Sequence, residues 1–200
     1  MTTYLEILNH CMNTVGERSV SSPDSNHPTA IQARVQIDRL IKEVQTRGWW
    51  FNKEYNVPLS PNGSDHVIIP QDTLKVTPLS PFRHLVRRNG KLYDPVEHTY
   101  AIGETVNVDL ILLLEVDDLP ETAAYFIMHS SAYDFYVADD GDEQKANRLE
   151  AAVLRSWQAL QAENLKESRV NSGNRITSRR LSARLQRGSS LNPNLPGGGE

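Results

Sequence analysis

The sequence predicts an α+β fold, with a helical bundle of about four helices, a β-rich insertion between the second and third helices, and an extended C-terminal tail. Near both ends of the chain, apolar residues recur every three or four positions, as in amphipathic helices. Between residues 51 and 117, proline, asparagine and glycine divide the chain into short segments typical of strands and turns. We therefore expect residues 1–50 and 118–167 to form the bundle, 51–117 the insertion, and 168–200 a basic, flexible arm.

The N-terminal part predicts two helices. Residues 3–15 form the first, which ends at Gly16. The second begins with Pro28 in its first turn and ends at Arg47 and Gly48, where a cation and a glycine suit a helix C-terminus. The expected inner faces are Leu5, Leu8, Met12 and Val15 in the first helix, and Ala30, Ala33, Ile37, Ile41 and Val44 in the second.

The insertion carries one specific turn signal. Asn89-Gly90 lies between two short apolar segments, a pattern that predicts a two-residue β-hairpin. The last strand, from Val106 to Leu114, begins with alternating apolar and polar residues and ends as a continuous apolar run. We expect it to be half-exposed at first and then buried on both faces.

Two further helices follow the insertion. Asp118 is the expected N-cap of the third helix, with Pro120 in its first turn and Glu121 completing a capping box. A turn at residues 139–142 precedes a longer helix that is expected to end near Lys166. The expected inner faces are Tyr125, Met128, Ala132 and Phe135, and then Ala146, Leu149, Val153, Trp157 and Leu160.

Charge is distributed unevenly along the chain. The net charge is −4, but the six arginines and one glutamate from Ser168 onward give the arm +5, which leaves −9 on the body. A basic arm on an acidic body is typical of an interaction segment. The arm has three interpretations: a contact with nucleic-acid phosphates, a contact with an acidic protein groove, or a solvated segment without a partner.

The sequence contains no recognisable catalytic, cofactor or metal motif. The six histidines are not spaced as ligands on one helix face, although a metal site assembled from distant residues stays open. Asp140-Gly141-Asp142-Glu143 differs from a calcium loop and fits a helix-connecting turn better. Phosphate-loop and nucleophile-elbow motifs are missing. The Trp49-Trp50-Phe51 run could stack bases, but large rings at a helix-to-sheet joint are the simpler interpretation.

Compartment is indicated by the single cysteine and by hydropathy. Cys11 excludes an internal disulfide and is expected to be a buried thiol. No apolar run is long enough to span a membrane, and the N-terminus lacks the basic region of a secretion signal. We expect a chain that folds in a reducing cytoplasm and does not insert into membranes.

Several short motifs, in this order and at this chain length, resemble the tail tubular protein A family of T7-like podoviruses. They are Val15-Gly16-Glu17, Thr46-Arg47-Gly48-Trp49 with Phe51-Asn52, Tyr93-Asp94, Val106-Asn107-Val108 and Leu119-Pro120-Glu121. The resemblance covers most of residues 1–167. The Asp139–Glu143 turn and the segment after Ser168 depart from it, so the resemblance implies least about the arm.

The resemblance implies a structural virion protein that is not an enzyme and has no cofactor. It implies a homo-oligomeric ring, a dodecamer, between the phage portal protein and the tail nozzle protein (tail tubular protein B). Double-stranded DNA would pass through its lumen during genome ejection. The expected location is the virion tail, assembled in the host bacterial cytoplasm. An acidic body suits such a conduit, because a strongly basic wall would retain phosphates.

Three contact regions follow as hypotheses. The hairpin residues Arg83, Arg87, Arg88 and Lys91 are expected to contact the nozzle. The arm residues Arg180, Leu181, Arg184, Leu185 and Arg187 are expected to contact the portal on a short amphipathic helix. Leu154 and Leu165 lie off the inner face of the last helix, which favours lateral self-association of the bundle.

Two other classes of protein stay open from the residues alone. One is a nucleic-acid-binding module that uses the arginine-rich arm, although such domains are usually basic on one face. The other is a small enzyme with a dispersed site.

Overall fold

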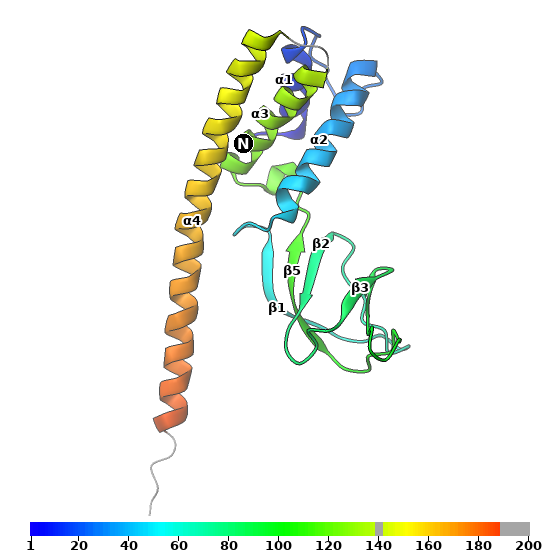
Figure 1. The fold of residues 1–200 in the computed structure, drawn as a ribbon, viewed down its shortest axis with the longest axis vertical. Helices are drawn as coiled ribbons and strands as arrows, with labels where there is room; N and C mark the ends of the chain where they lie inside the picture. Colours follow the sequence, from blue (N-terminus) through cyan, green and yellow to red (C-terminus); the bar gives the residue numbers. More distant parts are fainter. Residues whose placement is uncertain (139–141, 189–200) are drawn as a thin grey trace, which may run out of the picture. The chain divides into compact units, whose positions relative to one another are not determined.

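The computed structural model describes the backbone of residues 1–138 and 142–188, with side chains described as far as residue 168 (Figure 1). The chain separates into two compact units, residues 1–161 and 162–200. In chain order the elements are α1 (Tyr4–Thr14), α2 (Pro28–Thr46), β1 (Lys53–Leu59), β2 (Thr73–Pro78), β3 (Val86–Arg88), β4 (Lys91–Tyr93), β5 (Val106–Leu112), the 3₁₀ helix η1 (Val116–Asp118), α3 (Glu121–Ala138) and α4 (Glu143–Gly188). The last helix begins in the first unit and ends in the second.

Local signals position the first two helices. Thr3 caps α1 through a capping box in which Glu6 donates its backbone N–H to the Thr3 side chain and accepts from the Thr3 N–H at 2.8 Å. Gly16 follows α1 with a φ of +84°, a conformation in which glycine avoids a steric cost. Pro28 occupies the first turn of α2 as predicted, since its missing N–H has no intrahelical partner there.

The insertion contains a three-stranded antiparallel sheet in the order β1-β5-β2, and β3 and β4 form a separate hairpin. Asn89 and Gly90 at the hairpin tip have φ values of +51° and +70°, as a two-residue turn of the predicted kind requires. The predicted last strand is the central one, β5. Its first half alternates between buried and exposed residues, whereas Ile111 and Leu112 are only half-buried, so burial on both faces was predicted wrongly there.

Each half of the first unit has its own apolar core. The helices share one core, in which Ile7, Leu8, Met12, Ile37, Ile127 and Leu160 are fully buried. The insertion has a second, in which Val67, Leu92, Val106 and Val108 are fully buried. Figure 1 shows the helices at one end of this unit and the strands at the other. The predicted fold class, helices flanking a β-rich insertion, is confirmed.

The start of α3 differs from the prediction. Asp118 ends η1, and Glu121 does not fold back to cap the helix. Instead its carboxylate accepts hydrogen bonds from the Thr2 backbone N–H at 3.1 Å and the Thr2 hydroxyl at 2.6 Å. A tertiary contact with the N-terminus has replaced the local one, and these bonds hold the pKa of Glu121 below its ordinary value.

The predicted inner face of α3 is also partly wrong. Tyr125 is 45% exposed, while Ile127, Ser131 and Tyr136 are buried. The helix packs against both α1 and α2, so that more than one of its faces is covered. A single apolar stripe is therefore a poor guide for this helix.

The inner face of α4 agrees with the prediction within the first unit. Leu160 is fully buried, Trp157 packs against the helical core, and Leu154 on the other side is 54% exposed. The helical backbone continues to Gly188, well beyond the expected end near Lys166. No proline interrupts the sequence between Pro120 and Pro193, so nothing forces an earlier stop. Residues 139–141 of the predicted turn and residues 189–200 lie outside the described residues. The division of the chain at residue 168 stays a prediction.

Candidate functional site

The joint between bundle and sheet is held by two buried amide side chains, of which Gln45 at the end of α2 is the first. Its Oε1 accepts from the Leu114 backbone N–H at 2.8 Å, and its Nε2 donates to the Leu114 carbonyl at 2.9 Å. The side chain is fully buried. It therefore supplies Leu114, just past β5, with the two bonds that a neighbouring strand would provide.

Asn52 is the second buried amide. Its Oδ1 accepts from the Trp49 N–H at 2.8 Å, and its Nδ2 donates to the carbonyls of Gln45 at 2.9 Å and Leu112 at 2.8 Å. One side chain thus connects the end of α2 to the end of β5. Gly48 permits the tight turn between α2 and β1, because its φ is +73° and a Cβ there would lie 2.5 Å from Lys53 Cε.

Aromatic rings seal the same joint. Trp49 is 5% exposed and donates from its indole Nε1 to the Val44 carbonyl at 2.7 Å. Trp157 of α4 meets the Trp49 ring edge-to-face, with 5.6 Å between centroids, and carries the Arg47 guanidinium 5.0 Å from its own centroid. Trp50 and Phe51 pack against the helical core. The prediction that these three aromatic residues close the helix-to-sheet joint is confirmed. Trp49 is buried and therefore has no ring face free to stack on a base.

The predicted nozzle-contact residues lie on and beside one hairpin, and we call Arg83, Arg87, Arg88 and Lys91 the basic hairpin. Arg87 donates to the Thr73 carbonyl at the start of β2. Arg88 lies 4.0 Å from the centroid of the Tyr93 ring, and Lys91 Nζ is 3.1 Å from His66 Nδ1. Arg83, Arg87 and Arg88 are all exposed. Arg87, Arg88 and Lys91 lie on the β3–β4 hairpin and Arg83 lies in the segment before it. Arg87 and Lys91 also hold the insertion in shape.

A loop beside the basic hairpin, running from Asp94 to Thr99, is fixed by its own carboxylate. Asp94 accepts from the backbone N–H groups of Val96 at 2.8 Å and Glu97 at 3.1 Å, and lies 3.2 Å from His84 Nε2. These bonds, the Glu97 one first, lower the pKa of Asp94. The Asp94 carboxylate is thus bound within its own loop and to His84. The arginines of the basic hairpin are exposed to solvent.

The predicted portal-contact residues lie on the second unit. Backbone positions 180–187 are helical as part of α4, where the sequence predicts a short helix. The side chains of Arg180, Leu181, Arg184, Leu185 and Arg187 lie outside the described ones, so the apolar stripe and arginine face stay a prediction.

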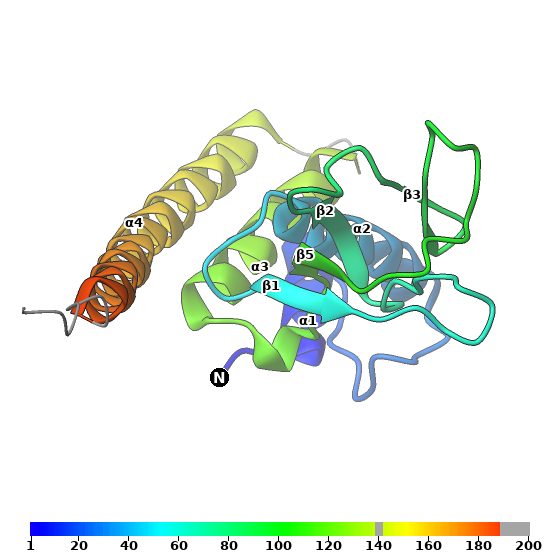
Figure 2. The same ribbon diagram turned by 90° about the horizontal axis from the view of Figure 1, so that it is seen from below.

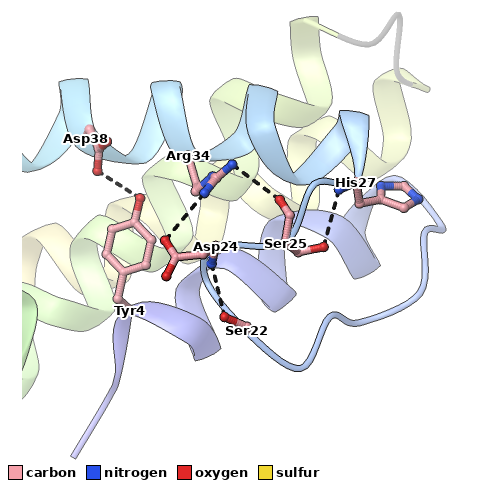
Figure 3. Close-up of polar contacts among 7 residues, drawn as sticks. All are labelled: Tyr4, Ser22, Asp24, Ser25, His27, Arg34 and Asp38. Atoms are coloured by element: carbon pink, nitrogen blue, oxygen red, sulfur yellow. Dashed lines mark hydrogen bonds and ion pairs between the residues drawn. The ribbon is translucent and has the colours of Figure 1, made fainter.

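The loop between α1 and α2 is tied down by side chains from both helices (Figure 3). Arg34 donates from Nη2 to the Ser25 carbonyl at 3.3 Å, and its Nη1 lies 3.8 Å from the Asp24 carboxylate. The Tyr4 hydroxyl donates to Asp38 Oδ1 at 2.8 Å. Burial and this bond to Asp38 raise the pKa of Tyr4. The first two contacts hold the Asp24–Ser25 part of the loop on α2, and the third connects α1 to α2.

A groove of about 340 Å³ runs between α3 and the first part of α4. It is lined by Thr122, Tyr125 and His129 from α3, and by Ala152, Arg155, Ser156 and Ala159 from α4. His129 also meets His10 of α1 edge-to-face, with 5.6 Å between ring centroids. Burial lowers the pKa of both imidazoles, so both are neutral at pH 7. Sequence reasoning missed this groove, because Ala152 and Ala159 carry no pattern of their own.

Three observations on the described residues concern thiol chemistry, metal binding and membranes. Cys11 is fully buried, and burial raises the pKa of its thiol to about 12, so it is no nucleophile at neutral pH. No group of three or more His, Cys, Asp or Glu side chains within the described part of the chain could hold a metal ion. Among the helices that are described, none is long and apolar enough to cross a bilayer.

The described part of the chain combines a helical bundle, a β-rich insertion joined to it by two buried amides, and a long last helix. The family model for tail tubular proteins matches residues 5–172, and the chain therefore belongs to the tail tubular protein family. It is 26% identical over 184 residues to tail tubular protein A of Klebsiella phage KP34, an alignment that covers 88% of this chain and 95% of that relative. The protein is thus a structural component of a bacteriophage tail.

Proposed function

We propose that this protein forms the adaptor ring that joins the portal to the tail nozzle of a short-tailed phage and encloses the genome-ejection channel. The observation that carries the proposal is the buried joint made by Gln45 and Asn52. It fixes two differently built ends, a helical one and a β-rich one, within one rigid unit. A protein that connects two different partners needs such a fixed relation between its two contact surfaces.

The β-rich end is proposed to meet the nozzle through the basic hairpin. Its exposed arginines, Arg83 and Arg88, would face an acidic rim and set the register of docking more than its affinity. The arm would attach to the portal, with both its leucines and its arginines in use. The chain would be a dodecamer, assembled in the host bacterial cytoplasm, with no catalytic role.

The charge of the body supports a conduit for DNA. Residues 1–167 carry a net −9, so a lumen formed by them would repel phosphates rather than retain them. Double-stranded DNA would then slide through without the salt-dependent affinity of a binding protein.

Electron microscopy of purified tails tests the proposal. We expect a ring of twelve copies of this chain between a portal and a nozzle. Particles that lack the gene should lack the ring. A location at the nozzle tip or on a fibre would overturn the adaptor assignment. A monomer that shifts oligonucleotides in a gel, with the shift lost at high salt, would instead support the nucleic-acid-binding alternative that uses the arm.

A further inference from the structure

Two exposed surfaces of the bundle lie on different elements, one on α2 and one between α3 and α4. The first, which we call the α2 ridge, consists of Ile31, Val35 and Asp38. Ile31 is 42% and Val35 66% exposed, and their side chains lie one helical turn apart on the same face. Asp38 follows them on the same face of α2, also exposed. The second surface is the α3–α4 groove.

The groove complements the ridge in shape. The ridge is convex, because its side chains project from one helix. The groove is concave and has a volume of about 340 Å³. On its α4 side, Ala152 and Ala159 have short side chains that leave room for a partner. Tyr125 on the α3 wall is 45% exposed and offers an aromatic surface to an aliphatic side chain.

The two surfaces also complement each other in charge. Arg155 lines the groove and is exposed, whereas the ridge ends in the carboxylate of Asp38. One Asp38 oxygen accepts from the Tyr4 hydroxyl, and a carboxylate has further acceptor positions for an arginine. An Asp38–Arg155 pair would fix the register of an apolar contact.

Their placement decides the kind of association. In Figures 1 and 2, α2 and the first part of α4 flank α1 and α3 from opposite sides. A surface that binds a different surface of the next copy makes a heterologous contact, which repeats around a ring when its rotation closes.

We infer that the α2 ridge of one copy docks in the α3–α4 groove of the next, which makes this the lateral contact of the oligomer. The occupant of the groove is thus a second copy of this chain. The inference rests on the proposed ring and adds which two faces meet. This lateral contact differs from the one expected at Leu154 and Leu165, because Leu154 is exposed on α4 outside the groove.

Cross-linking in assembled tails tests it. We expect the full-length double variant V35C/A159C, treated with a short bis-maleimide, to give a ladder of covalent oligomers, and either single variant to give none. The native Cys11 is buried and serves as the unreactive background. A matched control, V35C/L154C, should not give the ladder, since Leu154 does not line the groove.

A charge exchange gives a second readout. We expect D38R or R155E alone to lower incorporation into tails about tenfold, and the double variant D38R/R155E to restore it to within about twofold of the original. Replacing Asp38 also removes the Tyr4 bond, so Y4F, which removes only that bond, is the control and should incorporate normally.

Two failures are distinguishable. If micrographs show rings while the V35C/A159C ladder is missing, or while V35C alone gives dimers, the assignment of faces is wrong and the adaptor ring stands. If the chain forms no ring in any particle, the proposed function fails, and the lateral contact fails with it.

Discussion

Gln45 and Leu114 are joined by two hydrogen bonds, one accepted and one donated by the same buried amide, across 69 positions of sequence. This pair of residues connects the end of α2 to the segment that follows β5. Two hydrogen bonds between one side chain and one residue's backbone fix both the distance and the orientation of the two groups. The fixed relation of the bundle and the insertion depends on it.

Gln45→Leu is therefore expected to be costly although leucine is similar in volume. The substitution leaves the Leu114 N–H and carbonyl buried without partners, at about 1–3 kcal/mol for each unmet group. We expect the free energy of unfolding in urea to fall by about 2–4 kcal/mol. Gln32→Leu, at an exposed position of the same helix, is the matched control and should change it by less than about 0.5 kcal/mol.

Gly48→Ala should destabilise through both backbone and packing. Its φ of +73° is strained for alanine, and the new Cβ would lie 2.5 Å from Lys53 Cε and 2.6 Å from Ile111 Cδ1. Gly16→Ala isolates the backbone part, because Gly16 has a φ of +84° with nothing within 4 Å. We expect about 1 kcal/mol at Gly16 and at least about 2 kcal/mol at Gly48 by thermal unfolding. Equal costs would mean that the joint accommodates the extra methyl group.

The His10–His129 pair should make stability depend on pH. Burial lowers both pKa values in the folded chain, while the unfolded chain keeps the ordinary value of 6.5. As pH falls through 6.5 the unfolded state binds protons first, so stability is present above that pH and declines below it. We expect unfolding free energy to drop between about pH 7.5 and pH 5, and to drop less in H10Q/H129Q. H98N, at an exposed position where Asn suits the φ of +55°, is the control for replacing a histidine outside the bundle.

Arg83→Glu with Arg88→Glu tests the nozzle contact. Both side chains are exposed, and Arg87, whose guanidinium binds the Thr73 carbonyl, is left in place to keep the insertion folded. We expect normal unfolding to within about 1 kcal/mol, the cost of removing Arg88 from the Tyr93 ring, together with loss of the nozzle from purified tails. Arg18→Glu, at the opposite end of the bundle, is the control for charge. Normal nozzle incorporation in the double variant would contradict the assignment.

The arm is tested by deletion and by paired substitutions. Removing residues 168–200 should leave the first unit, 1–161, folded by circular dichroism while abolishing attachment to the portal. Replacing Leu181 and Leu185 by serine should weaken attachment nearly as much as replacing Arg180 and Arg184 by serine, because a protein groove uses both faces of a helix. If the leucine changes are silent and the arginine changes are not, the arm is an electrostatic contact with DNA.

The local features of the fold were predictable because their causes are local. The proline in the first turn of α2, Pro28, and the Asn89-Gly90 turn each act within a few residues of chain. The structure has α2 and the β3–β4 hairpin where these signals predict them. The buried Cys11 and the inner face of α4 followed from apolar periodicity. The pairing of Arg88 with Lys91 followed from the turn, since residues flanking a hairpin tip must lie close together.

What only the tertiary structure decided involves pairs far apart in sequence. Glu121 reads as a local helix cap, but the Thr2 hydroxyl and N–H, brought close by folding, bind it instead. From the sequence Gln45 is an ordinary helix residue, and no residue near it in the sequence indicates that its side chain binds Leu114. The α3–α4 groove likewise exists because small side chains of α4 lie opposite Tyr125 and His129 of α3. The sequence pattern determined the helices and strands of this protein. The packing of one element on another determined the joint and the surfaces. The physical reason is that a buried polar group binds the partner that lies near it in space, which can be far away in the sequence.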